Sequence, residues 1–172
     1  MRTLSVALVC VISLWAQRHG VGRVPAGEEI RALGVSVAPD GAGLPEGSGT
    51  AVEGRAVFAE RCAKCHGEKG DGDVGPALVG GQGTLATAKP RKTVGSFWPH
   101  APVVWDYVNR AMPFNQPGML SHRDVYAVVA YVLFLNGIVG EKDVMDAKSL
   151  GKVRMPNRDG FVPDSRPDVK RK

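Results

Sequence analysis

Two cysteines and a histidine stand close enough in the chain to act on one ligand: Cys62, Cys65 and His66, in the run CAKCH. Cysteines three residues apart lie on one side of a helix end, so their thiols can form thioethers to two neighbouring vinyl groups of a haem. The next residue then directs its imidazole at the iron, and Gly67 lets the chain turn away from the porphyrin. The spacing therefore predicts one covalent haem c with His66 as proximal ligand.

Two other kinds of site use a C-x-x-C pair. A dithiol redox centre needs a strand–helix–strand setting, whereas this pair ends a helical pattern. A structural zinc site needs four ligands, and the chain has no second C-x-x-C, so His100 or His122 would have to complete the set. Both stay open as alternatives. The aromatic content of only 6% favours haem, because a large apolar disc gives a small chain something to pack around.

The surroundings of the haem follow from the same motif. The second ring nitrogen of a ligating histidine normally donates to a carbonyl, which fixes the tautomer, and the carbonyl of Pro76 is the predicted acceptor for His66. Five further side chains are candidates to line the haem or to bond its propionates: Arg91, Ser96, Trp98, Trp105 and Tyr107.

The methionines are candidates for the second ligand of the haem iron. Met112 precedes Pro113, which biases it to an extended backbone, on a loop that must pass over the haem between two helices. Met119 stands two residues before a predicted helix start, where packing is its plainer role; Met145 and Met155 are further candidates. We expect Met112 to bind the iron, with Met119, a histidine or an open position as alternatives.

Three helices are expected to position these residues. Thr50 and Glu53 form a capping-box pattern that starts a helix over 51–62, with an apolar stripe of Val52, Ala56 and Ala59 and a close helix crossing at Gly54. A short helix is predicted within 99–111, after a Gly-rich loop over 67–98. The last helix begins after Ser121 and stops at Gly137, with apolar residues at i, i+3 and i+4 spacing.

The chain divides into four predicted segments. Residues 1–16 read as a signal peptide, because the apolar stretch from Leu4 to Ala16 is too short to span a bilayer comfortably; an uncleaved anchor is the alternative. This predicts export to the periplasm. Residues 17–47 are expected to be an extended arm, 48–140 the helical domain, and 141–172 an extended, basic, proline-containing tail.

The positive charge is concentrated at one end. The whole chain carries a formal charge of +5, and residues 148–172 hold eight Lys or Arg against three Asp or Glu. A nucleic-acid binder should show its cations on a folded face with interleaved aromatic residues, and this tail has only Phe161. We therefore expect no nucleic-acid partner, and either a solvated tail or docking on an acidic partner surface.

With these residues identified, the chain resembles the class I cytochromes c over residues 48–140. More narrowly, it is similar to the cytochrome subunit of the SoxCD/SorAB-type sulfur-compound (sulfane or sulfite) dehydrogenases. That resemblance rests on the runs GLPEGSG (43–49), TVGSFWP (93–99), WDY (105–107), RAMP (110–113) and MPNRDGF (155–161).

The resemblance implies an all-α, single-haem electron-transfer protein rather than an enzyme. Electrons would pass from a molybdenum-cofactor sulfur dehydrogenase subunit, through this haem, to a downstream soluble cytochrome. The sequence shows no acid–base pair or nucleophile set of its own. The alternative is a haem enzyme with an open sixth site, such as a peroxidase or a gas-binding protein.

Overall fold

The structure is a computed structural model that describes residues 22–32, 34, 36–164 and 166. The chain separates into two units, residues 1–34 and 35–172. In the first unit, the described residues form one short helix, α2 (Gly27–Ala32), near which Arg23 pairs with Glu29. The predicted signal peptide, residues 1–16, lies outside the described residues.

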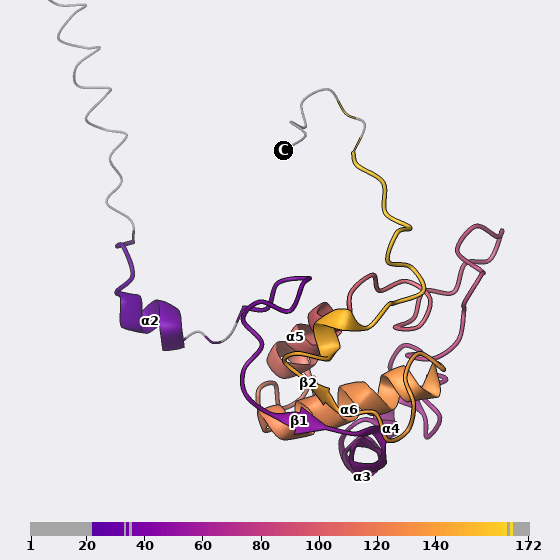
Figure 1. Ribbon diagram of the computed structural model, residues 1–172, viewed down its shortest axis with the longest axis horizontal. Helices are drawn as coiled ribbons and strands as arrows, with labels where there is room; N and C mark the ends of the chain where they lie inside the picture. Colours follow the sequence, from indigo (N-terminus) through magenta and orange to yellow (C-terminus); the bar gives the residue numbers. More distant parts are fainter. Residues whose placement is uncertain (1–21, 33, 35, 165, 167–172) are drawn as a thin grey trace, which may run out of the picture. The chain divides into compact units, whose positions relative to one another are not determined.

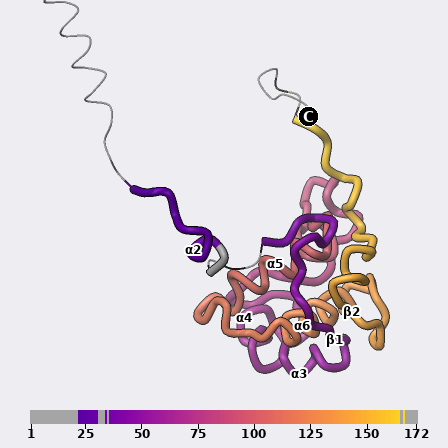
Figure 2. The backbone as a smooth tube through the Cα atoms, turned by 60° about the vertical axis from the view of Figure 1, so that its left-hand side comes forward, coloured from indigo at the N-terminus to yellow at the C-terminus, as the bar shows by residue number. Residues whose placement is uncertain are grey.

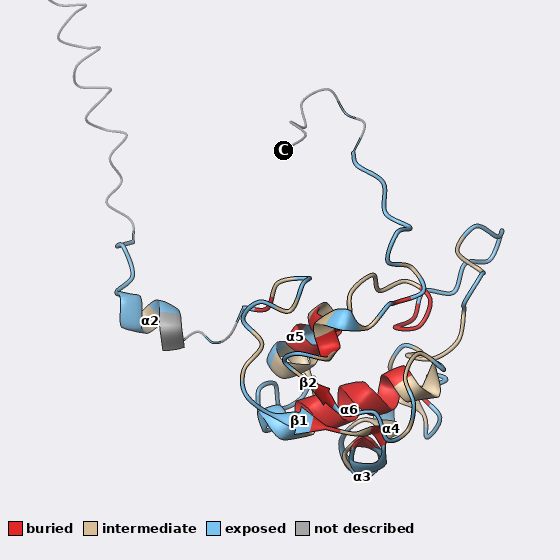
Figure 3. Cartoon of the chain, in the orientation of Figure 1, coloured by how far each residue is buried: buried red, intermediate tan, exposed pale blue. Residues whose placement is uncertain are grey.

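The second unit is a helical domain, as the sequence predicts (Figure 1). Its elements are β1 (Ser48–Gly49), α3 (Ala51–Arg61), α4 (Ala63–His66), α5 (Ala101–Ala111), α6 (His122–Leu135), β2 (Met145–Asp146) and the 3-10 turn η1 (Leu150–Lys152). Helix α6 lies in the middle of the domain, packed against both α3 and α5, and is the most buried helix (Figure 3). Within the part of the chain that the structure describes, no helix has the length and apolar character needed to span a membrane.

The ends of the helices follow the predicted signals. The Thr50 hydroxyl accepts from the Glu53 backbone N–H, and the Glu53 carboxylate accepts from the Thr50 backbone N–H, which completes the capping box of α3. The Ser121 hydroxyl caps α6: it accepts from the Asp124 backbone N–H and donates to the Asp124 carboxylate. Gly137 closes α6 with a positive φ of 69° and a Schellman pair of hydrogen bonds from residues 137 and 138.

The predicted close crossing at Gly54 is confirmed, but the predicted apolar stripe of α3 is wrong. A Cβ on Gly54 would stand 1.9 Å from the carbonyl oxygen of Ala127, so the backbones of α3 and α6 meet there. The buried face of α3 is therefore Ala51, Gly54 and Phe58. The residues of the predicted stripe, Val52, Ala56 and Ala59, are exposed. The helix turns its smallest residue to the core because that permits the closest approach to α6.

The segment before the domain is less extended than the sequence suggests. Residues 36–47 lie on the domain rather than apart from it: Val37 is buried, and its backbone N–H donates to Asp106 at 3.3 Å. The Tyr126 hydroxyl donates to the carbonyl of Pro45 at 2.9 Å. A Gly- and Pro-rich segment shows no periodicity, so its few apolar anchors do not stand out in the sequence.

The segment after the domain also differs from the expected extended tail. Strand β2 pairs antiparallel with β1, with Met145 opposite Gly49, and the chain after α6 returns beside β1 (Figure 2). Met145, Leu150 and Met155 are buried in the core. Met145, Leu150 and Met155 stand five positions apart in a largely polar and basic stretch. A pattern of that kind matches neither a helix nor a strand, and for that reason the sequence predicted a solvated tail.

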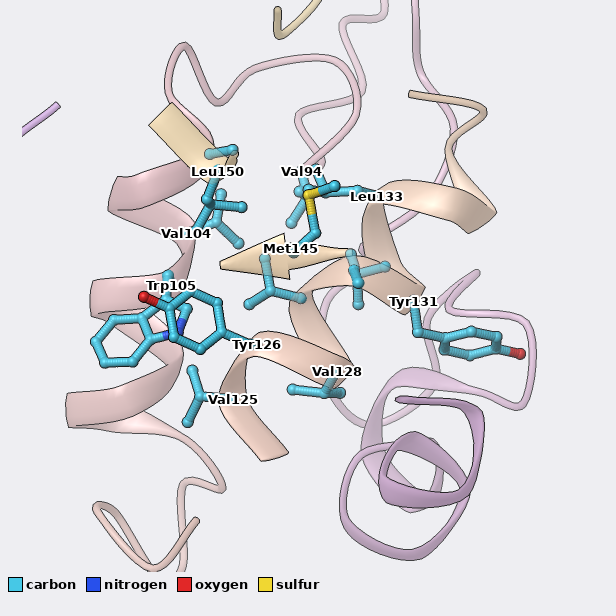
Figure 4. Close-up of a cluster of buried hydrophobic side chains, with 14 of the residues drawn as sticks. Val94, Val104, Trp105, Val125, Tyr126, Val128, Tyr131, Leu133, Met145 and Leu150 are labelled. Carbon is cyan, nitrogen blue, oxygen red and sulfur yellow. The ribbon is translucent and has the colours of Figure 1, made fainter. Parts of the chain in front are cut away.

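One continuous core joins these parts. Figure 4 shows Trp105 of α5 facing Tyr126 of α6, with Met145 and Leu150 in the same cluster. The Trp105 and Tyr126 ring centroids are 5.3 Å apart, and both side chains are fully buried. The flanking segments therefore close the edges of the core that the helices leave open.

The Gly54 crossing yields a direct test. Alanine favours a helix over glycine by about 1 kcal/mol, yet here its methyl group would overlap the Ala127 carbonyl, and overpacking costs about 1–3 kcal/mol. We expect Gly54→Ala to lower the free energy of unfolding measured in a denaturant titration. The hydrophobic core of the folded variant should also be more exposed to solvent. Ala56→Gly, at an exposed position of the same helix, measures the propensity difference alone. A Gly54→Ala variant more stable than the parent protein would contradict the crossing.

Candidate functional site

The C-x-x-C-H motif lies where α3 passes into α4. Cys62 ends α3 and precedes α4, while Cys65 and His66 occupy the last two positions of α4. The backbone N–H groups of Cys65 and His66 both donate to the Cys62 carbonyl at 3.0 Å, so the short helix holds the two cysteines on one turn. Gly67 ends the turn with a φ of 79°, as its predicted role requires. Both thiols are free, and Cys65 is exposed.

The orientation of His66 is set by a hydrogen bond. Its Nδ1 lies 2.7 Å from the carbonyl oxygen of Pro76, which confirms the predicted partner. A carbonyl only accepts, so Nδ1 carries a proton, and in a neutral imidazole Nε2 is then the nitrogen with the lone pair. This is the arrangement in which a histidine binds a metal through Nε2 while its other nitrogen is held by the protein.

The state of the thiols argues against a dithiol redox centre. Burial raises the pKa of the Cys62 thiol to about 11, and the neighbouring Cys65 adds to the rise. Reactive redox cysteines need the opposite, a lowered pKa that populates the thiolate. The structure does not support a zinc site either, because no group of three or more His, Cys, Asp or Glu side chains lies close enough to hold a metal in the described ranges.

Two observations fit a haem, one beside the motif and the other at α5 and its N-cap. Gly75 lies against the motif so closely that a Cβ there would stand 3.0 Å from the Cys65 carbonyl oxygen and 3.2 Å from His66 Cε1. Two buried ring nitrogens, Trp105 Nε1 and His100 Nδ1, find no hydrogen-bond partner among the described residues. Buried polar atoms are normally paired, and haem propionates are acceptors that would satisfy an N–H. His100 is half-buried.

The methionines of the described residues differ in solvent exposure and in their contacts. Met112 follows α5 directly, with an extended backbone (φ −125°, ψ 146°) and a half-buried side chain. Met119 is 41% exposed, and its sulfur lies 3.9 Å from a guanidinium nitrogen of Arg61. Met145 and Met155 are buried in the core. Of the two methionines between α5 and α6, Met112 is therefore the less exposed.

Four of the five predicted lining residues have other partners. Arg91 donates to the carbonyl of Asp71 at 2.9 Å, and Ser96 donates to the Arg91 carbonyl at 2.6 Å, so both hold the Gly-rich loop together. The Tyr107 ring is half exposed and makes an edge contact with Trp98. Trp105 keeps an unpartnered N–H. The sequence indicated His100 only as an alternative ligand, and the burial of its Nδ1 without a partner among the described residues arises from tertiary packing that no spacing rule contains.

A comparison with known proteins identifies the family of the helical domain. The sequence profile described as Cytochrome c matches residues 51–136, which include the motif, Pro76 and Met112. The chain belongs to the cytochrome c family. It is thus an electron-transfer protein of a family that binds haem c covalently, and the predicted resemblance is confirmed.

Two relatives act on sulfur compounds. The crystal structure of the sulfane dehydrogenase SoxCD from Paracoccus pantotrophus contains a similar chain, with a TM-score of 0.79 and 44% identity, covering 88% of this chain and 75% of that one. The thiosulfate dehydrogenase of Stutzerimonas stutzeri (strain A1501) is 27% identical over 114 residues. Those residues are 63% of this chain and 33% of that protein, so the chain spans about a third of that relative's length. The cytochrome c domain is therefore related to sulfur-compound dehydrogenases.

Proposed function

We propose that this protein is a periplasmic cytochrome with one haem c that carries single electrons away from a sulfur-compound dehydrogenase. Cys62 and Cys65 would hold the haem through thioethers, and His66 and Met112 would bind the iron. The observation that carries the proposal is the hydrogen bond from His66 to Pro76 beside two free thiols. A bound haem supplies a one-electron couple, and two protein ligands leave no open position for a substrate.

The proposed role of Met112 separates electron transfer from haem enzymology. In the haem-loaded protein, we expect Met112→Ala to abolish the thioether-to-iron absorption band at the red end of the spectrum. The midpoint potential should fall by roughly 0.1 V or more, within the roughly 0.8 V range that axial ligands span. The variant should also bind carbon monoxide, because its sixth position is open.

Met119→Ala is the matched control and should leave the band and the potential unchanged. If Met119→Ala loses the band instead, the ligand assignment is wrong. Rapid binding of cyanide or carbon monoxide by the unmodified protein would favour the haem-enzyme alternative.

The proposed partner is a molybdenum-cofactor subunit of a sulfane or sulfite dehydrogenase, with a soluble cytochrome as the next acceptor. The similarity to a chain of SoxCD supports this pairing. A basic surface offers a place to dock: Lys152, Arg154 and Arg158 line an open depression of about 350 Å³ with Gly151. Arg154 pairs with Asp159, and Lys148 adds a further exposed charge on the same segment. Such a surface fits an acidic partner.

This pairing predicts a rate that depends on salt. With such a dehydrogenase and its sulfur substrate, the haem should become reduced, and the rate should fall as ionic strength rises. Arg158→Glu should slow the reduction several-fold at low salt and match the parent at high salt. Lys89→Glu makes the same charge change at an exposed loop position outside the depression and serves as the control. Failure of the enzyme to reduce the parent protein would refute the partner, and equal rates for both variants would refute the docking surface.

A further inference from the structure

Asn136 joins the end of α6 to a loop more than fifty residues earlier in the chain. Its side-chain oxygen accepts from the Gly80 N–H at 3.1 Å. Its side-chain nitrogen donates to the carbonyl of Leu78 at 3.1 Å and to that of Val132, within α6, at 2.8 Å. The amide therefore uses both its oxygen and its nitrogen to hold the segment Leu78–Gly80 against the helix.

That segment leads directly to the carbonyl that orients His66. At its near end, the Gly75 N–H donates to the Cys65 carbonyl at 2.7 Å. At its far end, Leu78 and Gly80 are tied to Asn136. The backbone N–H groups of Leu78 and Val79 also donate to the Gly70 carbonyl, at 2.8 and 3.0 Å. Pro76 lies between the Gly75 bond and these far-end bonds, so the position of its carbonyl depends on both ends, and Asn136 contributes the side-chain part of the far end.

The Asn136 amide is itself held in place. A Cβ on Gly95 would stand 2.0 Å from the Asn136 side-chain oxygen, so the backbone at 95 packs directly on the amide. The Thr93 hydroxyl donates to the Gly80 carbonyl at 2.5 Å, which ties the same loop a second time. This packing leaves the amide little freedom to choose other partners.

We propose that Asn136 is a positioning residue for the axial histidine. By anchoring Leu78–Gly80, it holds the Pro76 carbonyl 2.7 Å from His66 Nδ1. A short bond from Nδ1 raises the electron donation of the imidazole through Nε2, which stabilises ferric over ferrous iron. Asn136 thereby lowers the midpoint potential without contacting the haem ligands. This inference rests on the proposed function, in which His66 binds the iron.

The test replaces the amide by an apolar group of similar size. In the haem-loaded Asn136→Leu variant, the His66 Nδ1 proton, observed by proton NMR of the ferric protein, should exchange with deuterated solvent several-fold faster than in the parent. The midpoint potential should rise, because the weakened bond makes the imidazole a poorer donor. A general loosening that admits water around the haem would instead stabilise the more charged ferric state and lower the potential, so the sign of the shift separates the two effects.

Two further variants complete the test. Gly95→Ala keeps the Asn136 amide but displaces it by steric contact, so it should also speed the exchange of the His66 Nδ1 proton and raise the midpoint potential. This variant provides the test if Asn136→Leu fails to retain haem. Gln82→Leu is the control, because Gln82 donates to the backbone carbonyl of Asn136 and leaves the side chain untouched. Its exchange rate and potential should equal those of the parent.

The outcomes distinguish this inference from the proposed function. If the parent protein shows no iron-bound His66 signal, the ligation by His66 is wrong. If the parent shows that signal but the Asn136 and Gly95 variants keep its exchange rate, or lower the potential, the positioning role of Asn136 is overturned while the proposed function stands.

Discussion

The close contact of α3 and α6 at Gly54 is the interaction on which the site depends. Glycine lets the α3 backbone rest on the Ala127 carbonyl, and Phe58 continues the contact one turn later against Tyr131, with ring centroids 5.3 Å apart. Helix α3 then runs straight into the C-x-x-C-H turn, so this crossing fixes where the two thiols stand relative to α6. At its other end, α6 holds the loop that reaches back to His66. Helix α6 thus positions the C-x-x-C-H motif through contacts at both of its ends.

Local patterns made the centre of this site predictable. The capping box of α3 and the C-x-x-C-H turn each depend on residues a few positions apart, whose geometry the helix or turn dictates, while Gly54 and Pro76 stood out by their residue types. The tail and the Asn136 anchor depend on contacts between distant segments. Single apolar residues such as Leu150 carry no period, and Asn136 reads only as the residue before a helix stop. Their roles arise from tertiary packing, which a spacing rule does not contain.

The flanking segments are part of the folded domain rather than additions to it. Val37, Met145, Leu150 and Met155 are buried in the same core as the helices. The similarity to the SoxCD chain covers 88% of this chain, well beyond the 51–136 of the family profile, so the flanks belong to the structure that the two share. In this cytochrome c domain, which has few aromatic residues, the segments before and after the helices complete the hydrophobic core. The C-terminal segment also presents basic side chains.

The most direct test of this account is the intact mass of the purified chain, taken together with its pyridine haemochrome spectrum. The account predicts a mass above that of the polypeptide by one haem, which survives acid denaturation, and a spectrum typical of a haem whose two vinyl groups are both saturated by thioethers. A mass equal to the polypeptide alone, with no haem absorption, would contradict the central claim that Cys62 and Cys65 attach a haem beside His66.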